Sequence, residues 1–222
     1  SPCLSFKTTR SKKIFLDRLK NDKRETKETL KNLKKYKIIA GVDEVGRGCL
    51  AGPVVSAAVI LKKGVQIKNL KDSKKLTFEQ RIEVSKNIKK NSFFSIGVAS
   101  VKEIEKLNIL QASLLSMKRA ILSLSKKPEL ILVDGIFAPQ ISIKCRTIIK
   151  GDEKIKCISA ASILAKVYRD KIMIKMSKKY KNYYWNKNFG YGTKQHIVGL
   201  KKYGLTTMHR KNFKPIHKML LK

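Results

Sequence analysis

The chain has 222 residues, 42% of them hydrophobic, and it carries 51 Lys and Arg residues against 16 Asp and Glu residues. The hydrophobic fraction is sufficient for a core, which excludes a globally disordered chain. The formal net charge of +35 predicts strong, salt-sensitive attraction to phosphate backbones and favours a nucleic-acid partner. A biased genomic composition rich in lysine is the alternative source of this charge.

Cysteine spacing and hydropathy exclude further classes of protein. The four cysteines have no CxxC spacing, so neither a zinc site nor a redox pair is indicated; they are Cys3, Cys49, Cys145 and Cys157. No secretory signal is recognisable in the sequence. The apolar run 38–61 contains three charged residues, four glycines and a proline, which argues against a membrane helix. We therefore expect a cytoplasmic protein without a membrane partner.

Residues 1–37 form the first distinct segment, with thirteen Lys and Arg residues against four Asp and Glu residues. Its few large apolar residues give at most two weak amphipathic helices. We expect a basic N-terminal arm or a peripheral helical extension, with solvated disorder as the alternative. Residues 38–222 are expected to form one domain, because no repeat or linker divides them.

Apolar runs and amphipathic segments alternate after residue 37. Strands are predicted at residues 38–42 and 54–61, joined by the glycine-rich sequence GRGCLAG, and are followed by a helix at 78–90 and a strand at 93–100. Apolar residues at helical spacing predict one helix over 104–125. Further strands are predicted at 130–133 and 145–149, and then a helix that Ser159 caps and that runs to residue 175. This order predicts an α/β protein with a mixed sheet and helices packed on it.

Asp43 and Glu44 are adjacent carboxylates in the most apolar run of a chain in which carboxylates are scarce. Buried charges must be paired, bound to metal or neutralised, so these two need a partner. Asp134 ends a predicted strand, and Asp152 lies in the turn KGDEK after another. All four carboxylates therefore lie at strand ends or in adjacent turns. Converging carboxylates suit hard cations such as Mg²⁺ or Mn²⁺, and two such ions can hydrolyse a phosphodiester.

Spacing alone leaves other interpretations open. A single aspartate at the end of a strand is more often a turn or helix cap than a catalytic group. The acid pair in its apolar run favours a functional role. Other acidic residues have the pattern of exposed helix charges, namely Glu79, Glu83, Glu103 and Glu105. No Ser–His–Asp or Cys–His arrangement is evident, so covalent catalysis is not expected.

Seven motifs, in order along residues 38–215, carry a resemblance to a known family. They read GVDEVGRGCLAGPVV, DSKKL, NILQASLLSMKRA, VDG, KGD, SAASILAKVYRD and GYGTKQH. In these motifs the chain resembles bacterial ribonuclease HII. The resemblance implies that residues 38–222 have a ribonuclease H-like fold, an α/β fold whose five-stranded mixed sheet is flanked by helices and followed by a helical C-terminal region.

The same resemblance implies an activity. Ribonuclease HII is a metal-dependent endonuclease that cleaves RNA in RNA–DNA hybrids and at single ribonucleotides embedded in duplex DNA. Its products carry 3′-hydroxyl and 5′-phosphate ends, and its implied role is the removal of ribonucleotides from DNA. The family's four acidic ligands, which imply a site for two Mg²⁺ or Mn²⁺ ions, correspond to Asp43, Glu44, Asp134 and Asp152. A ribonuclease HIII would carry a glutamate as the fourth acid, so Asp152 favours HII.

Four further positions match substrate contacts of the family. The GRG motif consists of Gly46, Arg47 and Gly48. Glycines there let the backbone approach the nucleic acid and test for the ribose 2′-hydroxyl, and a tight turn after a strand is the alternative. Tyr191 matches the tyrosine that packs on the sugar at the RNA–DNA junction, with a buried core tyrosine as the alternative.

Basic residues near the motifs are candidates for phosphate contacts. Lys166 and Arg169 lie on the predicted helix of SAASILAKVYRD, where a solvated helix face is the alternative. Weaker candidates are Lys74, Lys75 and Arg210. His196 fits the pattern YGTxxH, but a hydrogen bond within the fold is the favoured role. Two features depart from the family, namely Cys49 in place of a frequent proline, and the stretch around Trp185.

Three other functions agree with parts of this pattern. One is a two-metal nuclease or resolvase of the same fold that cuts DNA without needing a ribose. Another is a protein that binds RNA–DNA hybrids without cleaving them, although a pure binder gains nothing from anions placed near phosphates. The third is a ribosome-associated basic protein, which leaves the buried acid pair unexplained. We expect a monomeric enzyme whose partner is nucleic acid.

Overall fold

The computed structural model describes residues 32–68, 70 and 76–221. The chain divides into residues 1–37 and residues 38–222. Of the first unit only a short 3₁₀ helix, η1 (Asn32–Lys35), and the residues next to it are described. The predicted basic arm otherwise lies outside the described residues, and the domain boundary stays a prediction.

A five-stranded mixed sheet forms the centre of the second unit. Its strands are β1 (Ile39–Val45), β2 (Val54–Leu61), β3 (Ser92–Ala99), β4 (Leu130–Asp134) and β5 (Cys145–Ile148), in the spatial order β3-β2-β1-β4-β5. β1, β2 and β3 pair antiparallel, whereas β1, β4 and β5 run parallel. The carboxyl ends of these parallel strands therefore meet at one edge of the sheet. The predicted five-stranded mixed sheet is confirmed.

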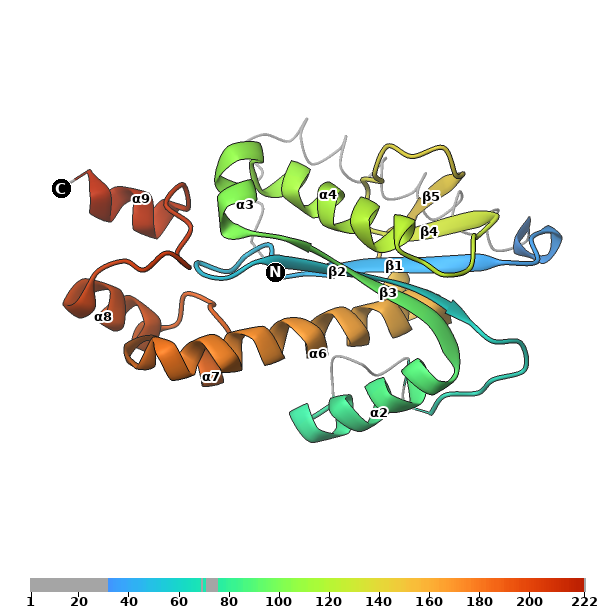
Figure 1. The fold of residues 1–222 in the computed structure, drawn as a ribbon, viewed down its shortest axis with the longest axis horizontal. Coiled ribbons are helices and arrows are strands. Elements are labelled where there is room, and N and C mark those ends of the chain that lie inside the picture. Colours follow the sequence, from blue (N-terminus) through green and yellow to red (C-terminus); the bar gives the residue numbers. More distant parts are fainter. Residues whose placement is uncertain (1–31, 69, 71–75, 222) are drawn as a thin grey trace, which may run out of the picture. The chain divides into compact units, whose positions relative to one another are not determined.

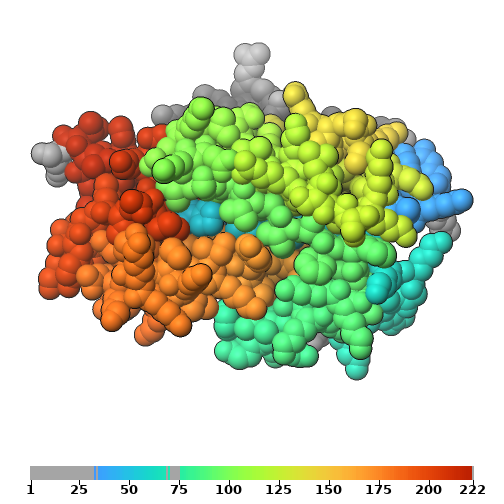
Figure 2. Space-filling model, in the orientation of Figure 1, coloured from blue at the N-terminus to red at the C-terminus, as the bar shows by residue number. Residues whose placement is uncertain are grey.

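Helices cover both faces of this sheet (Figure 1). α3 (Val101–Leu107) and α4 (Ile109–Leu122) lie on one face, and the long helix α6 (Lys156–Lys179) lies on the other with α2 (Phe78–Lys90) beside it. The remaining helices are α5 (Gly151–Lys154), η2 (Lys181–Tyr183), α7 (Trp185–Asn188), α8 (Lys194–Tyr203) and α9 (Lys214–Leu220). In the face drawn in Figure 2, the edge strand β3, in green, lies between the helical layers.

Alternation along β2 explains why the sheet carries two cores. Val55, Ala57 and Val59 face the core formed with α6, and Ala58 and Ile60 face the core formed with α4. Because successive side chains of a strand point to opposite faces, an uninterrupted apolar run is what a strand covered on both sides requires. The sequence VVSAAVIL therefore specifies a central, doubly covered strand.

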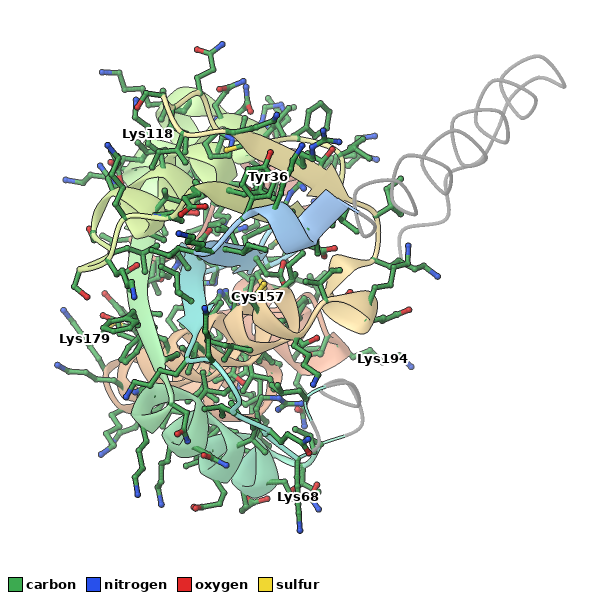
Figure 3. The ribbon with its side chains drawn as sticks, turned by 90° about the vertical axis from the view of Figure 1, so that its right-hand side faces the viewer. Tyr36, Lys68, Lys118, Cys157, Lys179 and Lys194 are labelled. Atoms are coloured by element: carbon green, nitrogen blue, oxygen red, sulfur yellow. The ribbon has the colours of Figure 1, made fainter. Side chains whose placement is uncertain are left out.

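α6 approaches β1 very closely at a glycine. A Cβ atom added to Gly41 would collide with the backbone of Cys157 and Ile158. Cys157, labelled in Figure 3, lies on α6 at this contact. Gly41 thus shows that alternate residues of β1, including Asp43, face the side of the sheet that α6 covers.

Three predicted elements differ from the structure. β1 extends to residue 45 and so includes the acid pair. The single helix predicted over 104–125 is two helices, because Asn108 has φ of 69° and its side chain accepts the N–H groups of Leu110 and Gln111. Ser159 does not cap α6, which begins at Lys156. Ser159 lies inside the helix, where its hydroxyl donates to main-chain oxygens.

The C-terminal helices enclose a third apolar cluster. Trp185 is fully buried in it, with Tyr183, Leu200 and Ile216 packed around it. This cluster also contains Leu50 and Ala51 of the glycine-rich turn, so the C-terminal region is anchored to the segment that follows β1. Among the described residues, no helix has the length and apolar character needed to cross a membrane.

Candidate active site

Asp43 and Asp134 lie side by side at the carboxyl edge of the sheet. Val42 of β1 is in register with Val133 of β4, and the two strands are parallel, so the next residues along them are neighbours. Asp43 faces α6, as does Asp134, because Val133 points into the opposite core. Strand geometry therefore brings together two carboxylates that are 91 positions apart in the sequence.

The turn after β5 brings Asp152 to the same edge. Lys150 adopts a left-handed conformation with φ of 54°, and α5 begins directly after it. The N–H group of Gly151 donates to Oδ1 of Asp134 at 2.6 Å, which ties α5 to the end of β4. Ser159 ties α5 to α6, because its hydroxyl donates to the main-chain oxygen of Asp152 at 2.5 Å. Asp152 lies in the first turn of α5 and is 5% exposed.

Burial and mutual repulsion raise the pKa values of three of the carboxyl groups, those of Asp43, Glu44 and Asp134. The pKa of Asp43 is raised well above its ordinary value, first by burial and then by the charges of Glu44 and Asp134. Burial also raises the pKa of Glu44, against the opposing effect of Arg47. The pKa of Asp134 is raised by burial and by the charge of Asp152. Asp43, Glu44 and Asp134 therefore lie in an electrostatic environment that favours protonation or a cation.

The donor set fits a hard divalent cation. As the side chains stand, the described residues contain no cluster of three Asp, Glu, His or Cys groups close enough to hold a metal ion. The pKa values of Asp43, Glu44 and Asp134 are nevertheless each raised in part by the charge of another carboxylate. Carboxylate oxygens without cysteine or histidine are the ligands that Mg²⁺ and Mn²⁺ prefer. By donor chemistry, the four predicted residues fit these ions.

The GRG motif forms the turn that follows the acid pair. Gly46 has φ of 98°, a conformation that favours glycine. The Arg47 side chain returns to the site, with Nη1 3.3 Å from Oε1 of Glu44. A Cβ atom on Gly48 would meet no atom within 4 Å, so the backbone there is open on the outside. The turn places an exposed stretch of backbone next to the carboxylates.

A cavity of about 340 Å³ lies between Glu44 and Tyr191. Its lining consists of Glu44, Val45, Arg81, Ser162, Ile163, Lys166 and Tyr191. The Tyr191 side chain is 41% exposed, so it is not a buried core tyrosine. Burial of the hydroxyl, together with the neighbouring Cys49, raises the pKa of Tyr191 to about 12. The phenol therefore stays protonated at neutral pH.

Lys166 lies between an acid and two aromatic rings. Its Nζ is 2.8 Å from Oδ1 of Asp170, 4.6 Å from the centroid of the Phe189 ring and 5.9 Å from that of Tyr191. These contacts direct a cation toward the cavity, at a distance where cation–π attraction operates. Lys166 lines the cavity, where it could contact a phosphate, and this contact stays a prediction.

Two of the predicted phosphate contacts are wrong. Arg169 is fully buried, and it donates to the main-chain oxygens of Ala51, Pro53 and Phe189. Arg210 is fully buried as well and also donates to main-chain oxygens. Neither guanidinium can reach a phosphate, because each is enclosed between the glycine-rich turn and the C-terminal region. The other two candidates, Lys74 and Lys75, lie outside the described residues.

His196 is hydrogen-bonded within the fold, as expected. Its Nδ1 is 2.8 Å from the main-chain oxygen of Tyr191, and its Nε2 accepts Trp185 Nε1–H at 3.1 Å and lies 3.0 Å from Nε2 of His209. Nδ1 must then carry the proton that it donates to Tyr191, and His209 must donate through Nε2. Thr206 N–H supplies the donor to His209 Nδ1. This network of neutral imidazoles holds the backbone of Tyr191.

Sequence reasoning missed Ser162 and Arg81 in the lining of the cavity. A hydrogen bond from Ser162 lowers the pKa of Asp43 and so stabilises its charged form. The signal for Ser162 was present, because Ser162, Lys166 and Asp170 are spaced by four residues and share one face of α6. No comparable signal marks Arg81, which comes from α2.

Comparisons with known proteins agree with the fold. The family model described as Ribonuclease HII matches residues 40–216. A Ribonuclease HII from Pelagibacter ubique is 58% identical over 185 residues, which cover 83% of this chain and 100% of that protein. The crystal structure of ribonuclease H2 from Pyrococcus horikoshii has a TM-score of 0.68 at 28% identity, covering 82% of this chain and 96% of that one. The crystal structure of Bst-RNase HIII in complex with Mn²⁺ has a TM-score of 0.63 at 18% identity, covering 83% of this chain and 69% of that one. At this identity the likeness supports the fold only.

The match to the family model and to relatives named Ribonuclease HII, on a mixed sheet flanked by helices, places the chain among the endonucleases of the ribonuclease H type. Their substrates are nucleic acids. Within this class the chain belongs to the ribonuclease HII family.

Proposed function

We propose that this ribonuclease H cleaves the RNA strand of RNA–DNA hybrids and the 5′ side of single ribonucleotides embedded in duplex DNA. The products would carry 3′-hydroxyl and 5′-phosphate ends. The observation that carries the proposal is the cavity that joins Glu44 of the acid pair to Tyr191, with the GRG turn next to it. A site that links carboxylates, an exposed backbone turn and a tyrosine can recognise a ribose beside the phosphate that is cut.

Asp43, Glu44, Asp134 and Asp152 would hold two Mg²⁺ or Mn²⁺ ions. Such ions, when bound, activate water and stabilise the negative charge that develops on the leaving oxygen. Support comes from the raised pKa values of three of these carboxyl groups, because burial outweighs the opposing cation, Arg47 at Glu44, and leaves a site that favours bound cations. The Mn²⁺ in the structure of Bst-RNase HIII is consistent with this proposal.

Protein side chains would orient the groups that react. Ser162 and the N–H group of Glu44, which is 2.7 Å from Oδ1 of Asp43, fix the Asp43 carboxylate. The Tyr191 ring would pack on the sugar, and Lys166 would contact a phosphate. The backbone of the GRG turn would test the 2′-hydroxyl. Glu44, Ser162, Lys166 and Tyr191 line the same cavity, and the GRG turn follows Glu44 directly in the chain.

The basic surface would bind the duplex over a wider area. Lysines labelled in Figure 3, such as Lys68, Lys118, Lys179 and Lys194, lie on the outside of the molecule and are exposed. Their charge would attract the phosphate backbone without reading sequence. We further propose that the enzyme acts as a monomer in the cytoplasm, with the basic segment 1–37 adding affinity for phosphates.

The proposal is tested by cleavage of two duplexes that differ in one 2′-hydroxyl. The wild-type protein should cut DNA containing a single ribonucleotide in Mg²⁺ or Mn²⁺, leave the all-DNA duplex intact, and lose activity in chelator. Asp43→Asn should lower the rate by at least about a thousandfold, since it removes a charged ligand. The control Glu83→Gln changes an exposed acid paired with Lys86 on α2 and should leave the rate unchanged. Equal cutting of both duplexes would instead indicate a nuclease without a ribose requirement.

A further inference from the structure

Two buried arginines lie behind the glycine-rich turn of residues 46–53, and the proposed chemistry uses neither. Arg169 comes from α6, and Arg210 comes from the segment after α8. Both side chains have no exposed surface. Removing a guanidinium from water is costly unless its N–H groups find hydrogen-bond acceptors. The acceptors here are main-chain oxygens, and most of them belong to the turn.

Arg210 ties the two ends of the turn together. Its Nη2 donates to the oxygen of Gly46 at 2.7 Å, and its Nη1 donates to that of Arg47 at 3.0 Å. The oxygen of Gly52 accepts from Nε at 2.9 Å and from Nη2 at 2.7 Å. The main-chain N–H of Arg210 also donates to the oxygen of Leu50 at 2.9 Å.

Arg169 supports the turn from the side of α6. Its Nε and Nη2 donate to the oxygens of Pro53 and Ala51, both at 2.9 Å, and its Nη1 donates to that of Phe189 at 2.8 Å. A Cβ atom on Gly46 would collide with the Arg169 side chain. The first glycine of the motif therefore leaves room for the arginine beneath it.

These bonds decide where the N–H groups of the turn point. In a trans peptide, the carbonyl of one residue and the N–H of the next point in opposite directions, and no cis peptide occurs among the described residues. Arg210 holds the carbonyls of Gly46 and Arg47 toward the interior. The N–H groups of Arg47 and Gly48 must then point away from it, and both residues are exposed.

We propose that Arg210, supported by Arg169, is a positioning residue that sets the preference for ribose, by directing the N–H groups of Arg47 and Gly48 toward the 2′-hydroxyl oxygen. This inference rests on the proposed contact between the GRG turn and the ribose. Two fixed N–H donors favour ribose over deoxyribose, because a deoxyribose offers them no hydroxyl oxygen as acceptor in a contact that excludes water. A lysine cannot replace the arginine, since one ammonium group cannot reproduce a planar fork of donors.

Binding of two duplexes to the full-length chain tests the inference. In an Asp43→Asn background, where cleavage is stopped, fluorescence anisotropy measures the affinity for an all-DNA duplex and for the same duplex with one ribonucleotide. We expect Arg210→Lys to reduce the ratio of the two affinities by about tenfold and to leave the affinity for all-DNA duplex unchanged. The matched control is Arg119→Lys, because Arg119 also binds a main-chain oxygen, that of Val98, but supports β3 instead of the turn. It should leave the ratio unchanged.

Each outcome is decisive. A folded Arg210→Lys variant with the wild-type ratio would overturn the inference, whereas the proposed function would stand if the wild-type protein still requires a ribonucleotide for cleavage. If the wild-type protein cuts both duplexes equally, the proposed function and the inference fail together. If Arg210→Lys does not fold, the inference is tested instead by the amide NMR signals of Arg47 and Gly48 in the Asp43→Asn protein. They should shift on adding the ribonucleotide duplex and not on adding the all-DNA duplex, and equal shifts would overturn the inference.

Discussion

Asp43 is buried and lies beside other carboxylates, and both effects raise its pKa above the ordinary value. A carboxyl group with a higher pKa in the folded state than in the unfolded state destabilises the fold when it is charged at neutral pH. We therefore predict that Asp43→Asn, which we expect to stop cleavage, raises the melting temperature in chelator at pH 7. A gain of about 1 kcal/mol corresponds to roughly 2–4 °C in a chain of this size. Calorimetry measures the change.

The difference in melting temperature between the wild-type protein and Asp43→Asn should depend on pH. As pH falls from neutral through the raised pKa, Asp43 takes up its proton in the folded state before it does so in the unfolded state, so wild-type stability gains relative to the variant. The two melting curves should converge at low pH. A variant that melts below the wild-type protein at pH 7 would contradict the prediction, and Glu83→Gln should match the wild-type protein at every pH.

Asn108 determines the break between α3 and α4. Its φ of 69° and ψ of 168° are unfavourable for a residue with a side chain, and its Oδ1 accepts two N–H groups of the first turn of α4. Asn108→Ala loses the cap and keeps the strain, so we expect a loss of about 2 kcal/mol. Asn108→Gly loses the cap but relieves the strain and should cost less than about 1 kcal/mol. Urea denaturation measures both, and equal losses would contradict this account.

The histidine network between α8 and the segment after it predicts a loss of stability in acid. Burial, together with the neighbouring His196, lowers the pKa of His209 to about 3. Below the unfolded-state pKa of about 6.5 the unfolded chain binds the proton first, so stability falls with pH until the folded-state pKa is reached. One such histidine costs about 2 kcal/mol by pH 5.

Trp185 is the one tryptophan of the chain and donates to this network, so its fluorescence reports unfolding of the cluster. In urea denaturation followed at Trp185, His209→Gln should flatten the fall in stability between pH 6.5 and pH 5. The exposed His217 provides the control, and His217→Gln should keep the wild-type slope. A wild-type slope in His209→Gln would contradict the assignment.

At the scale of the whole molecule, the net positive charge is expected to set the affinity for nucleic-acid duplexes. Residues 1–37 hold thirteen Lys and Arg residues against four Asp and Glu residues, about a quarter of the net charge of +35. We predict that a chain of residues 38–222 binds duplexes more weakly at low salt and shows a shallower dependence of log affinity on log salt concentration. Its preference for a ribonucleotide should be unchanged, because the cavity and the turn lie in the second unit. Salt titrations of both chains measure this, and an unchanged slope would contradict it.

Much of the fold was predictable because local patterns specify it. The apolar run VVSAAVIL predicts a doubly covered strand, and β2 has the predicted bounds. α2 likewise has the predicted bounds, and the structure adds that Thr77 and Gln80 form a capping box at its start. The interruption at Asn108 was not predicted, because apolar spacing continues across it and only the backbone conformation reveals the break.

The sequence by itself determined most strand and helix positions, and it singled out Asp43 and Glu44 because charged residues are rare in their apolar run. The roles of Asp134, Asp152, the GRG motif and Tyr191 came from the family resemblance and stay predictions. The tertiary structure decided how the basic residues are used. From the sequence, Arg169 and Arg210 have the pattern of surface cations, yet both are buried against main-chain oxygens. The reason is physical: whether a cation on a helix or loop meets water or a carbonyl depends on which distant segment packs over it, and no local pattern records that segment.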